Sequence, residues 1–193
     1  MNKDFFVNNK GKIIGIAIVA IIFFFFIGKY NSFVKKNEAI TGQWAQVDNQ
    51  LQRRFDLIPN IVSTVKGIAK QEKDIFGAIS NARTHYSGAT TIDEKAQAAG
   101  QVESAIGRLL VITENYPELK SSESFRDLTV ELEGTENRIS VERMKYNDLV
   151  KDLNTSIQTF PSSLVASMFG VKAHSYFEIA KEATAVPKVD FTQ

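Results

Sequence analysis

Residues 125–160 read FRDLTVELEGTENRISVERMKYNDLVKDLNTSIQTF, and their apolar spacing is the most regular in the chain. Steps of three and four residues alternate along one series: Phe125, Leu128, Leu132, Thr135, Ile139, Glu142, Tyr146, Leu149, Leu153, Ser156 and Phe160. This a/d spacing runs for five heptads, and it is typical of helices in left-handed bundles and coiled coils. Pro161 cannot continue a helix. We therefore predict a long helix that ends at Pro161 and packs against other helices.

Helical spacing also precedes this stretch. Three further apolar stripes are visible: Phe33, Ile40, Trp44, Val47 and Leu51; then Ile58, Ile61, Val65, Ile68, Ile75, Ile79 and Ala82; then Val102, Ile106, Leu109 and Thr113. Thr91-Ile92-Asp93-Glu94 has the pattern of a capping box and predicts the start of the third helix. Tyr116-Pro117 ends that helix, and Ser121 or Ser122 can cap the fourth.

Pro59 leaves two arrangements open. Proline suits the first turn of a new helix and disfavours helical geometry at Ile58, which predicts a reversal of the chain. Alternatively, the apolar stripe passes through Pro59 in register, as one kinked helix. We favour the reversal, because four helices of similar length can then bury all their apolar seams. The predicted fold is all-α, with an antiparallel up-and-down four-helix bundle.

Residues 13–27 (IIGIAIVAIIFFFFI) carry no charged side chain. With Gly28 they form a helix of roughly 24 Å, slightly shorter than the hydrocarbon core of a bilayer. Lys12 and Lys29 can snorkel and Tyr30 can lie at the headgroup level, so a single transmembrane helix is feasible. The run has no small-x-small cleavage pattern, which favours an uncleaved anchor over a signal peptide. We predict that residues 13–28 contact the lipid bilayer.

The orientation of this helix does not follow from the sequence. Three lysines precede the apolar run and three follow it closely, at positions 3, 10 and 12 and at positions 29, 35 and 36. The positive-inside rule therefore favours neither side of the membrane.

The 164 residues from Tyr30 onward are enough for one domain with its own core. They hold 19 of the 23 Lys and Arg residues and 21 of the 22 Asp and Glu residues. A nucleic-acid partner is not expected from this nearly neutral balance. The chain has no cysteine, which excludes thiol catalysis, disulfides and Cys-ligated metals.

Three charged residues fall on the apolar seams: Arg54, Glu72 and Glu142. An unpaired buried charge costs several kcal/mol, so these side chains should pair or face a wet cavity. One interpretation is an internal network that fixes helix register, with Arg53, Glu136 and Arg138 as candidates for completing it. Another is a polar pocket or a partner-contact site, and a third is a different register in which these residues are exposed.

Catalytic patterns are missing from the sequence. His85 and His174 lack the carboxylate three residues earlier that a di-iron bundle needs. The chain also has no G-x-S-x-G elbow and no phosphate-binding loop of the P-loop or Rossmann spacing. We therefore expect no catalytic, metal or cofactor-binding residues, no cofactor, and a protein that is not an enzyme.

The C-terminal part contains a second short apolar segment. Leu164, Val165, Met168 and Phe169 share one face of a helical turn that Gly170 closes. This face either caps the open end of the bundle or contacts lipid or another protomer. The predicted organisation is a tail (1–12), a transmembrane helix (13–29), a four-helix bundle (30–160), and a short helix with an extended tail (161–193).

Six stretches of the chain together resemble the LemA family. They are QWAQVDNQLQRRFDLIPN at 43–60, YPELK at 116–120, TENRI at 135–139, YN at 146–147, FP at 160–161 and YFE at 176–178. The resemblance implies a bacterial inner-membrane protein with a four-helix bundle and no established molecular activity. Genes for HtpX-type membrane peptidases often neighbour those of the family, which implies a role in envelope quality control.

These observations favour a membrane-anchored helical scaffold or interaction module. Such a protein can act by self-association as a homo-oligomer or by binding a membrane protein partner. The alternative is a ligand-binding sensor or enzyme that uses a polar interior around Arg54, Glu72 and Glu142.

Overall fold

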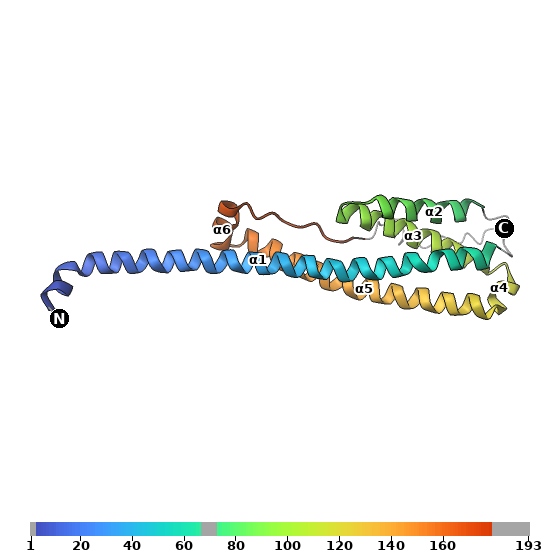
Figure 1. Cartoon of the computed structure of the whole chain (residues 1–193), viewed down its shortest axis with the longest axis horizontal. Coiled ribbons are helices and arrows are strands. Elements are labelled where there is room, and N and C mark those ends of the chain that lie inside the picture. The colour runs from blue at the N-terminus through green and yellow to red at the C-terminus, as the bar shows by residue number, and fades with distance from the viewer. Residues whose placement is uncertain (1–2, 67–72, 179–193) are drawn as a thin grey trace, which may run out of the picture. The chain divides into compact units, whose positions relative to one another are not determined.

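The computed structural model describes residues 3–66 and 73–178, and all regular secondary structure within them is helical. The helices are α1 (Lys3–Lys66), α2 (Lys73–Gly88), α3 (Ile92–Thr113), α4 (Pro117–Ser121), α5 (Glu123–Gln158) and α6 (Ser162–Phe169) (Figure 1). The prediction of an all-α protein with a long apolar N-terminal helix is confirmed. The sequence did not predict the short helix α4, which Pro117 begins.

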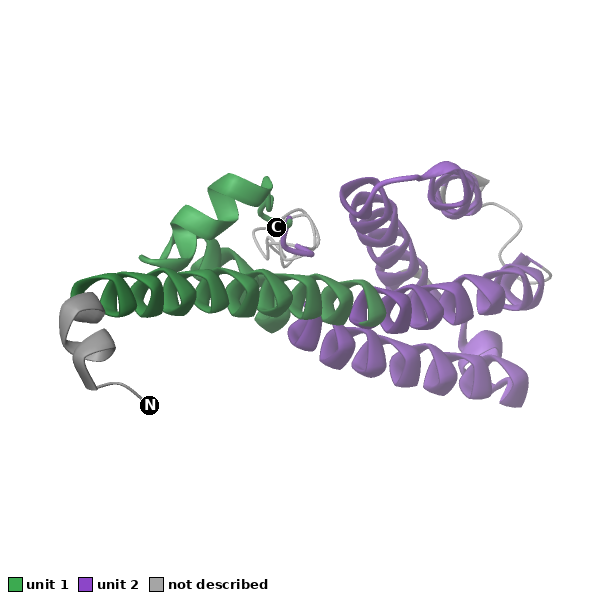
Figure 2. Cartoon of the chain, turned by 60° about the vertical axis from the view of Figure 1, so that its left-hand side comes forward, with its two compact units in different colours: residues 1–42, 148–174 green, residues 43–147, 175–193 purple. Residues whose placement is uncertain are grey.

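The chain divides into two compact units, coloured separately in Figure 2. Unit 1 comprises residues 1–42 and 148–174, and unit 2 comprises residues 43–147 and 175–193. Helices α1 and α5 each contribute one part to unit 1 and the other part to unit 2.

The core of unit 2 contains the apolar stripes that the sequence predicts. Buried residues of α1 are Val47, Leu51, Phe55, Ile58, Ile61 and Val65; those of α2 and α3 include Ile79, Ala82, Val102, Ile106 and Leu109; those of α5 include Phe125, Leu132, Ile139 and Tyr146. The rings of Phe55 and Tyr86 lie 4.1 Å apart between centroids and join α1 to α2. Each helix therefore turns its predicted stripe inward.

The predicted reversal at Pro59 is wrong, because α1 continues through this residue to Lys66. Proline in a helix interior removes one hydrogen bond and costs roughly 3 kcal/mol. Burial of an aliphatic side chain contributes about 1.5–3 kcal/mol, and Ile58, Ile61 and Val65 are all buried after the turn that Pro59 disturbs. Continuing the stripe in register therefore outweighs the local cost, while Pro59 itself faces solvent.

The predicted starts of the third and fourth helices are confirmed. The Glu94 backbone N–H donates to Thr91 Oγ1 at 3.2 Å, and the Thr91 N–H donates to Glu94 Oε2 at 3.0 Å. This is the reciprocal bonding of a capping box, and it begins α3. At the start of α5, the Phe125 N–H donates to Ser122 Oγ at 3.4 Å. Ser122 is therefore the cap of α5.

Unit 1 brings the end of α5 and helix α6 against α1. Lys36 Nζ donates to Asp152 Oδ1 at 2.9 Å and to Ser156 Oγ at 2.5 Å. The predicted inward position of Phe160 is wrong, since α5 ends at Gln158 and the Phe160 side chain is 75% exposed. In α6 Val165 is buried, whereas Leu164, Met168 and Phe169 are exposed. Of the predicted short helix and extended tail (161–193), residues 179–193 lie outside the described residues.

A substitution of Pro59 tests the continuous helix. In Pro59→Ala, residue 59 regains an N–H that can bond to the Phe55 carbonyl, and no buried contact is lost. We expect the free energy of unfolding in urea, followed by Trp44 fluorescence of the detergent-solubilised chain, to rise by about 1–2 kcal/mol. The control Asn49→Ala, at another exposed position of α1, should change it by less than about 0.5 kcal/mol. Destabilisation by Pro59→Ala would contradict the uninterrupted helix.

Candidate functional site

Arg54 is a buried charged residue of unit 2, with 6% of its surface exposed. It lies on α1 and donates from Nη1 to Glu136 Oε2 on α5 at 2.6 Å. Arg54 Nε and Gln50 Oε1 are also buried and have no hydrogen-bond partner within the described residues. Unsatisfied buried groups of this kind cost about 1–3 kcal/mol each. Arg54 therefore depends on Glu136 for compensation of its charge.

Glu103 of α3 belongs to the same cluster of charges. Its side chain is half-buried, and burial raises its pKa above the ordinary value. The negative charge of Glu136 raises the pKa of Glu103 further, while Arg54 and Arg143 oppose the shift. The cluster thus balances two carboxylates against two guanidinium groups. Sequence periodicity missed Glu103, because it lies outside the stripe of Val102, Ile106 and Leu109.

The other predicted network residues lie elsewhere. Glu142 accepts from Gln43 Nε2 at 2.6 Å and from Lys145 Nζ at 2.8 Å. These hydrogen bonds, that of Lys145 above all, lower the pKa of Glu142. Arg138 lies exposed on α5, and Glu72 lies outside the described residues. The structure therefore brings Arg54 together with Glu136, and places Glu142 with Gln43 and Lys145.

Asp48 of α1 connects three helices of unit 2. Its Oδ1 accepts a hydrogen bond from the Tyr86 hydroxyl of α2 and lies 2.8 Å from Lys95 Nζ of α3. Burial, together with the adjacent Asp48 carboxylate, raises the pKa of the Tyr86 hydroxyl. Tyr86 therefore stays protonated and acts as a permanent donor to Asp48.

Stretches that are far apart in the sequence meet at Trp44. Its ring lies 5.5 Å from that of Tyr146 and 5.7 Å from that of Phe177, both in edge-to-face arrangements. Asn147 donates from Nδ2 to the Phe177 carbonyl at 3.1 Å and accepts from the Phe177 N–H at 2.8 Å. The Tyr146 hydroxyl donates to the Ser175 carbonyl at 3.1 Å, and burial raises its pKa to about 12. Within unit 2, these side chains hold Ser175 and Phe177 beside α1 and α5.

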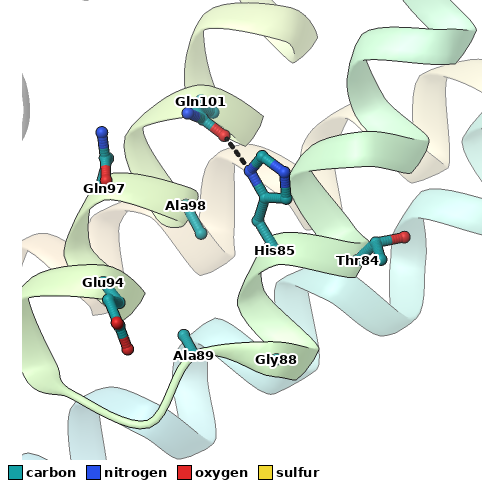
Figure 3. A pocket seen from close by; sticks show the side chains of 8 residues that line it. All are labelled: Thr84, His85, Gly88, Ala89, Glu94, Gln97, Ala98 and Gln101. Atoms are coloured by element: carbon teal, nitrogen blue, oxygen red, sulfur yellow. Dashed lines mark hydrogen bonds between the residues drawn. The ribbon is translucent and has the colours of Figure 1, made fainter.

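Unit 2 also has an open pocket of about 370 Å³ between α2 and α3 (Figure 3). His85 points from α2 toward Gln101 of α3, with 3.2 Å between Nδ1 and Oε1. The Glu94 carboxylate in the lining already accepts from the backbone N–H groups of Thr90 and Thr91, which lower its pKa. Within residues 3–66 and 73–178, no three His, Asp or Glu side chains lie close enough together to hold a metal ion.

The predicted membrane flanks lie on α1. Lys12 is exposed, and Lys29 Nζ lies 5.8 Å from the centre of the Phe25 ring. Tyr30 is partly exposed, and its ring lies 4.7 Å from that of Phe169. Between these flanks the apolar side chains face outward, and this part of α1 is long and apolar enough to cross a membrane.

Adjacent arginines allow the buried ion pair to be tested against an exposed one. The pair Arg54–Glu136 is largely buried. The pair Arg53–Glu131 joins the same two helices but is exposed, with 3.5 Å between Arg53 Nη2 and Glu131 Oε1. We expect Glu136→Gln to reduce the free energy of unfolding by about 2 kcal/mol, because Arg54 stays buried without its partner. The control Glu131→Gln should cost less than about 1 kcal/mol.

Double-mutant cycles separate the pair from its surroundings. One cycle combines Arg54→Met with Glu136→Gln, and the other combines Arg53→Met with Glu131→Gln. For each cycle, the free energy of unfolding in urea is measured for both single variants and for the double variant. The coupling free energy should be several-fold larger for Arg54–Glu136. Equal coupling in the two cycles would show that the Arg54 cluster is solvated.

The raised pKa of Glu103 predicts a pH dependence of stability. The folded protein retains a proton that the unfolded chain releases, so the free energy of unfolding falls as pH rises from about 4.5 toward the folded pKa. Glu103→Gln should remove this fall and stabilise the protein at neutral pH, measured by urea unfolding across the acidic range.

Glu94→Gln is the control of opposite sign. The pKa of Glu94 is lowered on folding, so its stabilisation is present above about pH 4.5 and is lost as pH falls. A Glu103→Gln variant whose stability follows the unmodified chain at every pH would contradict the buried environment of Glu103.

Known proteins and a protein-family model are similar to most of this chain. The chain is 24% identical to magnetosome protein MamQ 2 of Paramagnetospirillum magneticum over 191 residues, which cover 84% of this chain and 70% of that protein. It is 22% identical to protein LemA of Metamycoplasma hominis over 177 residues, which cover 91% of this chain and 78% of that protein. The model of the LemA family matches residues 43–191, which include Trp44, Arg54 and Phe177. The resemblance seen in the sequence is thereby confirmed, and the chain belongs to the LemA family.

Proposed function

We propose that this chain is a single-pass inner-membrane protein whose membrane-external part is a four-helix bundle that acts as a scaffold or interaction module. The observation that carries the proposal is the outward-facing apolar part of α1, where Ile16, Ile21 and Phe24 are each about 70% exposed. Side chains of this kind on all faces of a helix require an apolar solvent. The lysines that bracket the run suit the two headgroup regions.

Contacts within unit 2 support the bundle. Gln43 pairs with Glu142 and Arg54 pairs with Glu136, so residue numbers rise on α1 as they fall on α5. These two helices are therefore antiparallel. Asp48 joins α1 to α2 and α3, while His85 and Gln101 join α2 to α3. Four helical segments connected in this way fit an up-and-down bundle.

The polar interior supports a structural role more than a chemical one. Arg54 bonds to Glu136, Glu142 bonds to Gln43 and Lys145, and Tyr86 bonds to Asp48. The alternative function, a sensor or enzyme built on Arg54, Glu72 and Glu142, has less support because Arg54 and Glu142 already have partners within the chain. We propose a non-enzymatic protein that works through self-association or a membrane protein partner, in envelope quality control.

Membrane insertion provides the test of the anchor. The double variant Ile18→Lys with Ile21→Lys places two charges near the middle of the apolar run, at a cost of about 3 kcal/mol each. We expect most of the protein to move from the carbonate-resistant membrane fraction to the soluble fraction. The control Val130→Lys with Val141→Lys adds the same charges at exposed valines of α5 and should leave the protein in the membrane fraction.

Two results would contradict the proposal. Retention of the Ile18→Lys, Ile21→Lys protein in the membrane fraction would contradict the proposed anchor. The scaffold role would be contradicted if the full chain were strictly monomeric after extraction in detergent and captured no partner by cross-linking in cells.

A further inference from the structure

We infer that α6, together with Phe160, forms a second membrane contact of this chain, lying in the headgroup region beside the point where α1 leaves the bilayer. The inference rests on the proposed membrane anchor and adds a lipid-binding element to it. Leu164, Met168 and Phe169 of α6 are exposed by 55%, 67% and 50%, and Phe160, four residues before Leu164, is exposed by 75%. The occupant of this surface is the interface of the same bilayer that holds residues 13–28.

The position of α6 along α1 supports this occupant. Tyr30 follows the apolar run by two residues, a rise of roughly 3 Å along a helix, so it lies at the start of the headgroup region. The Phe169 ring lies 4.7 Å from the Tyr30 ring. The end of α6 is therefore at the same level as Tyr30. Amphipathic helices at this level bury their apolar face by about 5–10 Å.

Helix α5 leads the chain toward the same level. Lys36 pairs with Asp152 and Ser156, and the residues of α5 after Ser156 continue in the direction of the anchor. Gln158, the last residue of α5, follows Ser156 by two residues, which corresponds to roughly 3 Å of helix, and Phe160 comes two residues later. The turn that carries Phe160 and starts α6 is thus directed toward the membrane end of unit 1.

Charge distribution favours lipid over water. The 19 residues from Leu153 to Val171 carry no charged side chain, whereas about five charges are usual for a stretch of this length. Lys172 follows at once, where a cation can reach anionic headgroups. The exposed side chains Leu164, Met168 and Phe169 thus lie in an uncharged stretch and form an apolar surface of the kind that marks contact with a membrane or a protein.

Contacts after α6 keep this helix in place. Gly170 has a φ of 65° and ends α6 in the left-handed conformation, with the Val171 N–H donating to the Ala166 carbonyl at 2.9 Å. Further on, the His174 N–H donates to Asn154 Oδ1 at 3.0 Å, and His174 Nε2 lies 2.7 Å from Asn37 Oδ1. Val165 is buried within unit 1, whereas Leu164 and Met168 are exposed.

Site-specific probes on the full chain test this arrangement. The chain has no cysteine, so Met168→Cys carries one environment-sensitive fluorophore after reconstitution into phosphatidylcholine–phosphatidylglycerol vesicles. Met144→Cys is the matched control, since Met144 is another exposed methionine, on α5 in unit 2. Ile21→Cys reports on the anchor, and Leu164→Cys repeats the measurement one turn earlier on α6. Circular dichroism and Trp44 emission confirm that each variant is folded.

Nitroxide-labelled lipids then distinguish the outcomes. We expect the probe at 168 to be quenched several-fold more than the probe at 144, and more strongly by a nitroxide near the headgroup than by one deep in the acyl chain. The probe at 21 should show the reverse depth preference. A probe at 168 that behaves like the probe at 144, while the probe at 21 is quenched, overturns the inference and leaves the anchor intact.

Two further results also overturn it. A probe at 168 with blue-shifted emission but no quenching by lipid means that protein, such as a second copy of the chain, covers this face. An unquenched probe at 21 refutes the membrane anchor, and with it the basis for α6 as a lipid contact.

Discussion

Helix α1 changes its solvent requirement within about two turns. From Ile13 to Ile27 its apolar side chains are exposed on all faces, whereas from Phe33 to Val65 its buried apolar side chains lie on one stripe. Hydrophobic burial contributes about 25 cal/mol per Å² of apolar surface removed from water, so the two parts need different surroundings. In unit 1, α6 contacts α1 at Tyr30 and α5 contacts α1 at Lys36. Both residues follow the exposed apolar run that ends at Ile27. The position of the change therefore determines where the other helices can pack.

Polar groups inside unit 2 select one register among several. Apolar seams alone allow helices to slide by one turn at small cost, but Arg54 and Asp48 each have specific partners on other helices. Displacing Arg54 from Glu136 would leave a buried guanidinium uncompensated, which is strongly unfavourable. The exposed pair Arg53–Glu131, on the same two helices, has no such consequence because water solvates both groups. Neighbouring residues with the same chemistry thus differ in effect through burial.

Local patterns in the sequence predicted the local features of the fold. The capping box at Thr91 and Glu94, the cap at Ser122 and the buried stripes of α2 and α3 depend on short-range spacing, and all were found. Pro59 was misjudged because its cost is local, while the gain from burying Ile61 and Val65 depends on helices far away in the chain. Glu136 was among the candidate partners of Arg54. Glu103 was not, because only packing of α3 against α1 and α5 brings it near.

The segment after α6 shows the limit of periodicity most clearly. It has no regular structure, so its backbone groups need partners other than a helix or sheet. Asn147 and Asn154 supply them, each bonding to both the N–H and the carbonyl of one residue, Phe177 and His174 respectively. These asparagines lie one heptad apart on α5, a spacing that looks like an ordinary polar face in the sequence.

Hydrogen bonding also explains why the exposed apolar surfaces matter for function. The buried ionic and hydroxyl groups Arg54, Tyr86 and Tyr146 bond to Glu136, Asp48 and the Ser175 carbonyl within the chain. In contrast, the outward side chains of residues 13–27 and of α6 gain nothing from water and have large exposed areas. Contiguous apolar side chains that face outward on unit 1 suit an apolar environment there. These exposed apolar side chains are the observation on which the proposed membrane contact rests.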